Sequence, residues 1–127
     1  MASTLKINTL TGVSTAGSIA VTGEGNSTTT NLQQGLCKVW IKTPANGASV
    51  SDSFNVSSAT DSATGQVIVN INNDMGNADY AIGMSTNTNV DQTLIVDQLT
   101  GSYDMRTWNG SAYVDIGMRT IVAGDLA

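Results

Sequence analysis

The sequence contains no histidine, and it has one cysteine, one proline and one glutamate among 127 residues. Without histidine, Ser-His-Asp and Cys-His nucleophilic arrangements are excluded. A histidine-based metal site is excluded as well, and a single cysteine cannot build a zinc site. Neither of the glycine-rich phosphate cradles, GxxxxGK[ST] or GxGxxG, is present. We therefore expect no catalytic residues, no metal and no cofactor.

Charge is also scarce, because only 12% of the residues are Asp, Glu, Lys or Arg, against about 25% in an average protein. The net charge is −5 and the five cations are scattered along the chain, so nucleic acid is not an expected partner. No run approaches the ~20 apolar residues that span a membrane. The N-terminus lacks the pattern of a secretory signal, which favours synthesis in a reducing cytoplasm.

Cys37 lies among apolar residues, and with no second cysteine it cannot form an intrachain disulfide. We expect it to be a buried, inert thiol.

The carboxylates leave one enzymatic alternative open, since a glycosidase needs only two carboxyl groups about 5–10 Å apart. Most of the aspartates stand beside Ser, Asn or Gly in turns, where Asp bonds locally to the backbone, so structural roles are favoured. The candidates would be Asp52, Asp61, Asp74, Asp79, Asp104 and Asp115.

The stretch NINNDMGNAD spaces oxygen ligands around Gly76, as calcium loops do. These ligands would be Asn70, Asn72, Asp74 and Asp79. No bidentate glutamate closes the loop, so a turn that binds nothing is the favoured interpretation.

Alternation of apolar and polar residues dominates the chain from residue 35 onward and predicts strands with one face on a core. LCKVWIKT places Cys37, Val39 and Ile41 on one face, and QVIVNIN places Val67, Val69 and Ile71 inward. SVSDSFNVSS places Val50, Phe54 and Val56 together, and DYAIGMST does the same for Tyr80, Ile82 and Met84. QTLIVDQL has a continuous apolar centre, which suggests cover on both faces.

Turns and loops separate these strands. Pro44 with Asn46-Gly47 predicts a turn, ATDSATG a loop, and SYDMRTW-NG-SAYVDIGMRTIV a hairpin. Asn109-Gly110 suits a type I′ turn, because both residues tolerate positive φ. No helix of normal length is predicted. The expected fold is all-β: a small antiparallel sandwich or barrel-like head, residues 35–127, with an extended N-terminal arm.

Residues 1–34 are rich in Gly, Ser and Thr and cannot bury enough apolar area alone to offset backbone ordering. We expect an arm that orders on docking, with STLKINTL as a short strand. Its apolar docking residues are Leu5, Ile7, Leu10 and Val13.

Aromatic residues opposite the apolar faces are the strongest interaction signal. Trp40 and Trp108 lie on such faces, and we expect a subunit interface ahead of the edge of the core or a glycan contact. The candidate contact residues are Trp40, Tyr103, Trp108 and Tyr113.

The segments KVWIK, DSFNVSSATDSATG, VIVNIN and NADYAI together resemble a β module of tail-fibre and other virion proteins of tailed bacteriophages, notably those of marine hosts. The opening MASTLKINTL is similar to the start of such proteins. The resemblance covers roughly the first two thirds of the chain and excludes the segment from Ser102 onward.

The resemblance implies a virion structural protein, usually a homotrimer. It implies no catalytic residues in this sequence. It implies a fibre or decoration that docks to capsid, neck or tail proteins by its arm. Tail fibres are usually much longer than 127 residues, so a head fibre or a capsid decoration fits as well. A carbohydrate-binding adhesion module is the alternative.

Overall fold

The computed structural model describes residues 4–13, 15, 18–23, 25, 27–45 and 49–127. The chain divides into two compact units, Met1–Leu36 and Cys37–Ala127, and each is described by itself. Asn46 and Gly47, where a turn was predicted, lie outside the described residues.

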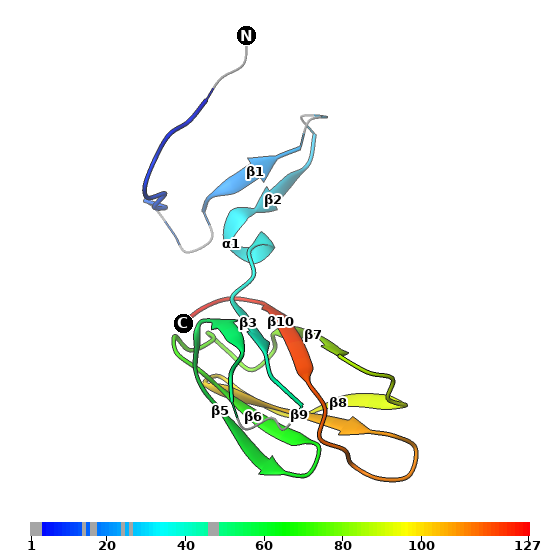
Figure 1. Cartoon of the computed structure of the whole chain (residues 1–127). Helices are drawn as coiled ribbons and strands as arrows, with labels where there is room; N and C mark the ends of the chain where they lie inside the picture. The colour runs from blue at the N-terminus through cyan, green and yellow to red at the C-terminus, as the bar shows by residue number, and fades with distance from the viewer. Residues whose placement is uncertain (1–3, 14, 16–17, 24, 26, 46–48) are drawn as a thin grey trace. The chain divides into compact units, whose positions relative to one another are not determined.

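The first unit contains a two-stranded antiparallel sheet of β1 (Ala20–Thr22) and β2 (Thr29–Asn31), followed by the one-turn helix α1 (Leu32–Gly35) (Figure 1). The Asn31 side chain caps this helix by accepting a hydrogen bond from the Gln34 backbone N–H. Residues 4–10 form no strand, so the strand predicted for STLKINTL is wrong over its described part. The prediction failed because alternation alone does not supply a pairing partner.

The second unit is a sandwich of two four-stranded antiparallel sheets (Figure 1), which confirms the all-β prediction. One sheet has the order β4-β3-β10-β7 and the other the order β5-β6-β9-β8. The strands are β3 (Val39–Lys42), β4 (Asp52–Phe54), β5 (Val56–Ala63), β6 (Gln66–Ile71), β7 (Ala81–Thr86), β8 (Gln92–Leu99), β9 (Ser102–Trp108) and β10 (Met118–Ala123).

The core lies between the two sheets and is built by alternating residues of β3, β6, β9 and β10. Its buried members are Val39, Ile41, Val67, Val69, Ile71, Met75, Tyr80, Tyr103, Met105, Met118 and Val122. A polar contact in the core links the two sheets, where the Tyr103 hydroxyl and Thr120 Oγ1 lie 2.5 Å apart. Burial raises the pKa of Tyr103 to about 12, so this phenol stays protonated and able to donate.

Asn55 marks the corner where the chain leaves one sheet for the other. Its φ is 58°, and it separates β4, which pairs with β3, from β5, which pairs with β6. The alternation expected through SVSDSFNVSS therefore breaks, since Phe54 and Val56 lie in different sheets. The segment predicted as a loop, ATDSATG, instead continues β5 as far as Ala63.

The predicted hairpin at Asn109-Gly110 is wrong beyond its first pair. Trp108 and Tyr113 form an isolated bridge, but β10 pairs with β3 and β7 in the opposite sheet. The physical reason is that β9 is already paired on both edges, with β6 and β8. The turn is not type I′ either, because Gly110 has a positive φ and Asn109 does not.

Two burial predictions also fail. Cys37 is exposed, not buried, because it precedes β3 instead of facing the core from it, and its thiol lies 3.1 Å from the Val39 carbonyl oxygen. The apolar centre of β8 is not covered on both faces, since Leu94 and Val96 are exposed. The strand lies at the edge of its sheet, with β9 as its single partner.

Candidate interaction surfaces

An apolar row crosses the outer face of the β4-β3-β10-β7 sheet. The register places Trp40 opposite both Phe54 and Ile121, so three large apolar side chains lie side by side on three strands. Phe54 is 52% exposed and Ile121 61%, while Trp40 is half-buried. We call Phe54, Trp40 and Ile121 the apolar row. Such a row on a small domain is the kind of surface that another protein surface covers.

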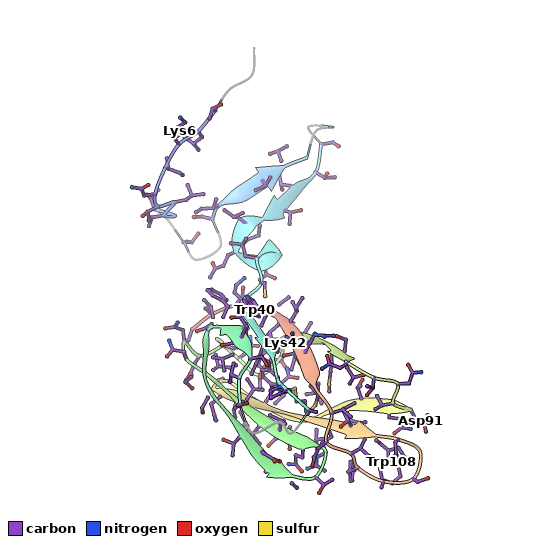
Figure 2. The ribbon with its side chains drawn as sticks, in the orientation of Figure 1. Lys6, Trp40, Lys42, Asp91 and Trp108 are labelled. Carbon is purple, nitrogen blue, oxygen red and sulfur yellow. The ribbon has the colours of Figure 1, made fainter. Side chains whose placement is uncertain are left out.

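A charged row runs parallel to the apolar row, at the neighbouring positions of the same strands that share its face. Lys42 lies opposite both Asp52 and Arg119. The charged row therefore begins with a negative residue on the edge strand β4 and continues with two positive residues on β3 and β10. Figure 2 labels Trp40 and Lys42 along β3.

The outer face of the second sheet carries a different group, which we call the Trp108 cluster: Trp108, Tyr113, Arg106, Asp104 and Gln66. The rings of Trp108 and Tyr113 meet edge to face with centroids 5.1 Å apart. The Arg106 guanidinium lies 6.0 Å from the centre of the Tyr113 ring, within reach of a cation–π interaction. Figure 2 marks Trp108 at the end of β9.

Asp104 is the polar centre of the Trp108 cluster. Its Oδ2 accepts a hydrogen bond of 2.6 Å from Gln66 Nε2 and lies 3.4 Å from an Arg106 guanidinium nitrogen. Burial raises the pKa of the Asp104 carboxyl above its usual range, with Arg106 and Gln66 opposing the rise and the Asp97 carboxylate adding to it. Asp104 Oδ1 and Arg106 Nε are both buried without a hydrogen-bond partner.

Tyr103 does not belong with the other predicted contact residues. It is 1% exposed and faces the core, because it alternates with Asp104 along β9 and points to the opposite side of the sheet. The structure thus brings Trp108 and Tyr113 together, places Trp40 on the other sheet and removes Tyr103 from the surface. Strand pairing adds Phe54 and Ile121 to the surface around Trp40, and it adds Arg106 to the surface around Trp108. The sequence pattern alone does not reveal these pairings.

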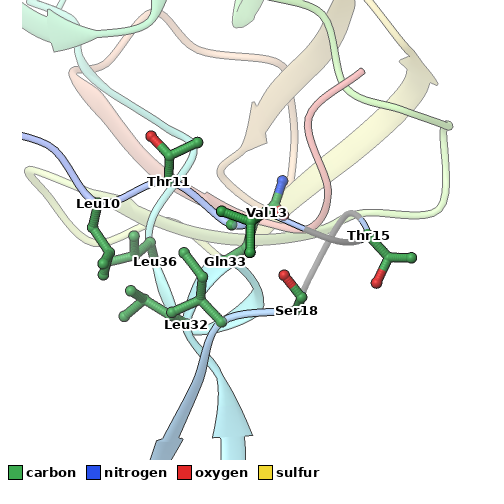
Figure 3. A pocket seen from close by; sticks show the side chains of 10 residues that line it. Leu10, Thr11, Val13, Thr15, Ser18, Leu32, Gln33 and Leu36 are labelled. Atoms are coloured by element: carbon green, nitrogen blue, oxygen red, sulfur yellow. The ribbon is translucent and has the colours of Figure 1, made fainter.

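The apolar residues predicted for docking lie in the first unit and are exposed: Leu5 78%, Ile7 51%, Leu10 54% and Val13 98%. Leu10 and Val13 border a hollow of about 560 Å³ whose apolar lining includes Ile19, Leu32 and Leu36 (Figure 3). Leu5 and Ile7 lie outside this lining. These side chains are available to a partner, and their docking role stays a prediction.

Two of the aspartates that kept the glycosidase alternative open accept hydrogen bonds from the backbone. Asp115 Oδ1 accepts a hydrogen bond from the Gly65 N–H, and Asp52 Oδ1 accepts one from the Ser53 N–H. Asn70 donates to the Ser58 hydroxyl instead of pointing alone into a loop. Within the described part of the chain, no three His, Cys, Asp or Glu side chains gather as metal ligands would.

No family model, curated protein or solved structure matches the chain. The described residues include no helix with the length and apolar character of a membrane span.

Proposed function

We propose that this chain is a structural protein of a tailed-bacteriophage virion, a fibre or decoration that assembles as a homotrimer through the apolar row. The observation that carries the proposal is the unbroken row of Phe54, Trp40 and Ile121 across three strands, in which Phe54 and Ile121 are more than half exposed. Covering such side chains gains roughly 25 cal/mol per Å² of apolar surface, and aromatic side chains are frequent anchors of protein interfaces.

The charged row favours a second copy of this chain as the occupant. It has a negative end at Asp52 and positive residues at Lys42 and Arg119. A head-to-tail contact between copies lets Asp52 of one copy approach Arg119 of the next. Contacts of this heterologous kind close into rings when the rotation allows it, as three-fold symmetry requires.

The assignment to a virion rests on the sequence segments that resemble phage β modules, several of which build this sheet and its corner. KVWIK covers β3, and DSFNVSS spans β4, the Asn55 corner and the start of β5. In this proposal the first unit docks on other virion proteins through Leu5, Ile7, Leu10 and Val13, whose exposed side chains need cover.

Electron microscopy of phage particles labelled with an antibody against this chain tests the location. We expect label on the assembled particle, at its head, neck or tail. Particles purified to constant composition that carry no label, and no peptide of this chain by mass spectrometry, would show that it is not a virion component.

A further inference from the structure

The Trp108 cluster has the two components of a saccharide site, namely an exposed apolar platform and buried polar groups beside it. Both lie on the outer face of the β5-β6-β9-β8 sheet. Arg106 is opposite Gln66 on one side and Leu94 on the other, and Gln92 is opposite Trp108. This face belongs to the sheet that does not carry the apolar row, so the two surfaces are distinct.

The platform consists of Tyr113, Trp108 and Leu94. Tyr113 is 42% exposed and Leu94 38%, and the edge-to-face contact with Trp108 holds the Tyr113 ring in place. An aromatic side chain combines a large apolar surface with a polar tip and loses little conformational entropy when it binds. The C–H face of a sugar ring is a matching surface.

The polar component is the pair of unpartnered atoms, Asp104 Oδ1 and Arg106 Nε. Asp104 is 7% exposed, and a buried carboxylate oxygen without a donor costs free energy. One of these atoms is an acceptor and the other a donor. A hydroxyl group satisfies both kinds of atom, since it donates one hydrogen bond and accepts others, and neighbouring hydroxyls on a sugar ring supply several such groups.

Access to these atoms depends on Arg106. Its side chain is 28% exposed and lies over the Tyr113 ring at the margin of the platform. Because Asp104 Oδ1 and Arg106 Nε are both buried, a ligand can bond to them only after a side chain of the cluster moves, and the partly exposed Arg106 has room to do so. The hydrogen bond from Gln66 Nε2 to Asp104 Oδ2 does not involve Arg106 and orients the carboxylate.

We infer that the Trp108 cluster binds a neutral saccharide, whose ring packs on Tyr113 and Trp108 while its hydroxyl groups donate to Asp104 and accept from Arg106. A neutral ligand is favoured over an acidic one, because the chain carries a net charge of −5 and Asp97 lies opposite Asp104 in the strand register. The inference stands whether or not the chain belongs to a virion.

The test is binding of the full chain to an array of short neutral oligosaccharides of hexoses and N-acetylhexosamines, with uronic-acid oligosaccharides beside them. The strongest neutral binder is then titrated by calorimetry. We expect Tyr113→Ala and Arg106→Gln each to weaken its affinity about tenfold or more, as loss of a platform ring or of a charged hydrogen-bond donor does. Val50→Ala, at an exposed apolar residue outside both surfaces, is the control and should leave the affinity unchanged.

The thermal unfolding midpoint of each variant shows that the fold is intact, and Arg106→Gln, which keeps a long polar side chain, covers the case in which Tyr113→Ala unfolds. The inference is overturned if no neutral oligosaccharide binds, if only uronic-acid oligosaccharides bind, or if folded Tyr113→Ala and Arg106→Gln variants retain the affinity of the parent chain.

Discussion

At the scale of single residues, Asn55 decides how the chain passes between the two sheets. Its φ of 58° is a conformation that asparagine tolerates better than most residues other than glycine. Its side chain also ties three segments together: Oδ1 accepts from the Asn73 N–H at 2.8 Å, and Nδ2 donates to the carbonyls of Lys38 and Asn73 at 3.1 Å. The corner thus combines an unusual backbone with a satisfied side chain.

Two substitutions at Asn55 separate these contributions. Asn55→Gly removes the hydrogen bonds but accepts the positive φ, and should lower the free energy of unfolding by roughly 1–2 kcal/mol. Asn55→Ala adds the cost of an alanine at positive φ, a further loss of about 1 kcal/mol. Chemical denaturation measures both. An alanine variant as stable as the glycine variant would show that the backbone conformation of this corner carries no strain.

Tyr103 makes the stability of the fold depend on pH in the alkaline range. Its pKa is raised to about 12 by burial, whereas a tyrosine in an unfolded chain ionises near 10. The folded state therefore holds the proton more tightly, and the stability it contributes is complete below pH ~10 and is lost as the pH rises toward ~12. Tyr80, whose pKa burial and Asp97 also raise to about 12, acts with the same sign.

Tyr103→Phe should make the alkaline loss of stability less steep, by roughly 1 kcal/mol per pH unit, the slope of one proton. At neutral pH the same variant should be less stable by about 1 kcal/mol, because the hydrogen bond to Thr120 is gone. Urea denaturation across this pH range measures both effects. A variant whose alkaline profile is as steep as that of the parent would mean that Tyr103 does not keep its proton in the fold.

At the scale of elements, the turn between β5 and β6 is held against the segment that follows β9. Gly65 has a φ of 70°, its N–H donates to Asp115 Oδ1 and its carbonyl accepts from the Thr107 N–H at 2.9 Å. A Cβ on Gly65 would meet backbone atoms of Val114 and Thr107 at 2.7 and 2.9 Å. No flexible side chain is available there to move aside.

Gly65→Ala should therefore destabilise the fold by roughly 2–3 kcal/mol, because it combines backbone strain with a backbone clash. Gly83→Ala is the matched control within a strand: its Cβ would lie 3.9 Å from the Ile121 carbonyl oxygen, an ordinary contact. We expect that variant to stay within about 0.5 kcal/mol of the parent. Thermal unfolding compares the two, and equal midpoints for both variants would contradict the proposed packing at Gly65.

The local sequence pattern predicted the strands of the second unit better than it predicted which strands pair with one another. Alternation identified the inward residues of β3 and β6, since a pleated strand with one buried face leaves a period of two in its sequence. Pairing order depends on contacts distant in sequence, such as β3 with β10. The hairpin at Asn109 was mispredicted for this reason, as a local turn signal does not show that both edges of β9 are occupied.

The same limit applies to the candidate surfaces. Trp40 and Trp108 were identified because each lies opposite the apolar face of its own strand. Ile121 and Phe54 were not identified, since only the register of β10 and β4 against β3 places them beside Trp40. Tyr103 was included in error, although its own alternation with Asp104 pointed it into the core.

At the scale of the whole molecule, we propose different tasks for different surfaces. In this proposal the apolar row binds further copies of the chain, the exposed apolar residues of the first unit dock on other virion proteins, and the Trp108 cluster binds saccharide. Shape and association, and not turnover, are the proposed basis of function. The apolar row is central, because the proposed trimer depends on it.

Sedimentation velocity over a series of concentrations, comparing the parent chain with Ile121→Asp, tests this claim most directly. Ile121 is 61% exposed, so the aspartate should leave the fold intact while placing a charge in the apolar row. We predict that the parent chain sediments as a species of three times its 13.1 kDa mass and that the folded variant sediments as a monomer. A parent chain that stays monomeric at every concentration, or a variant that assembles as the parent does, would contradict the account.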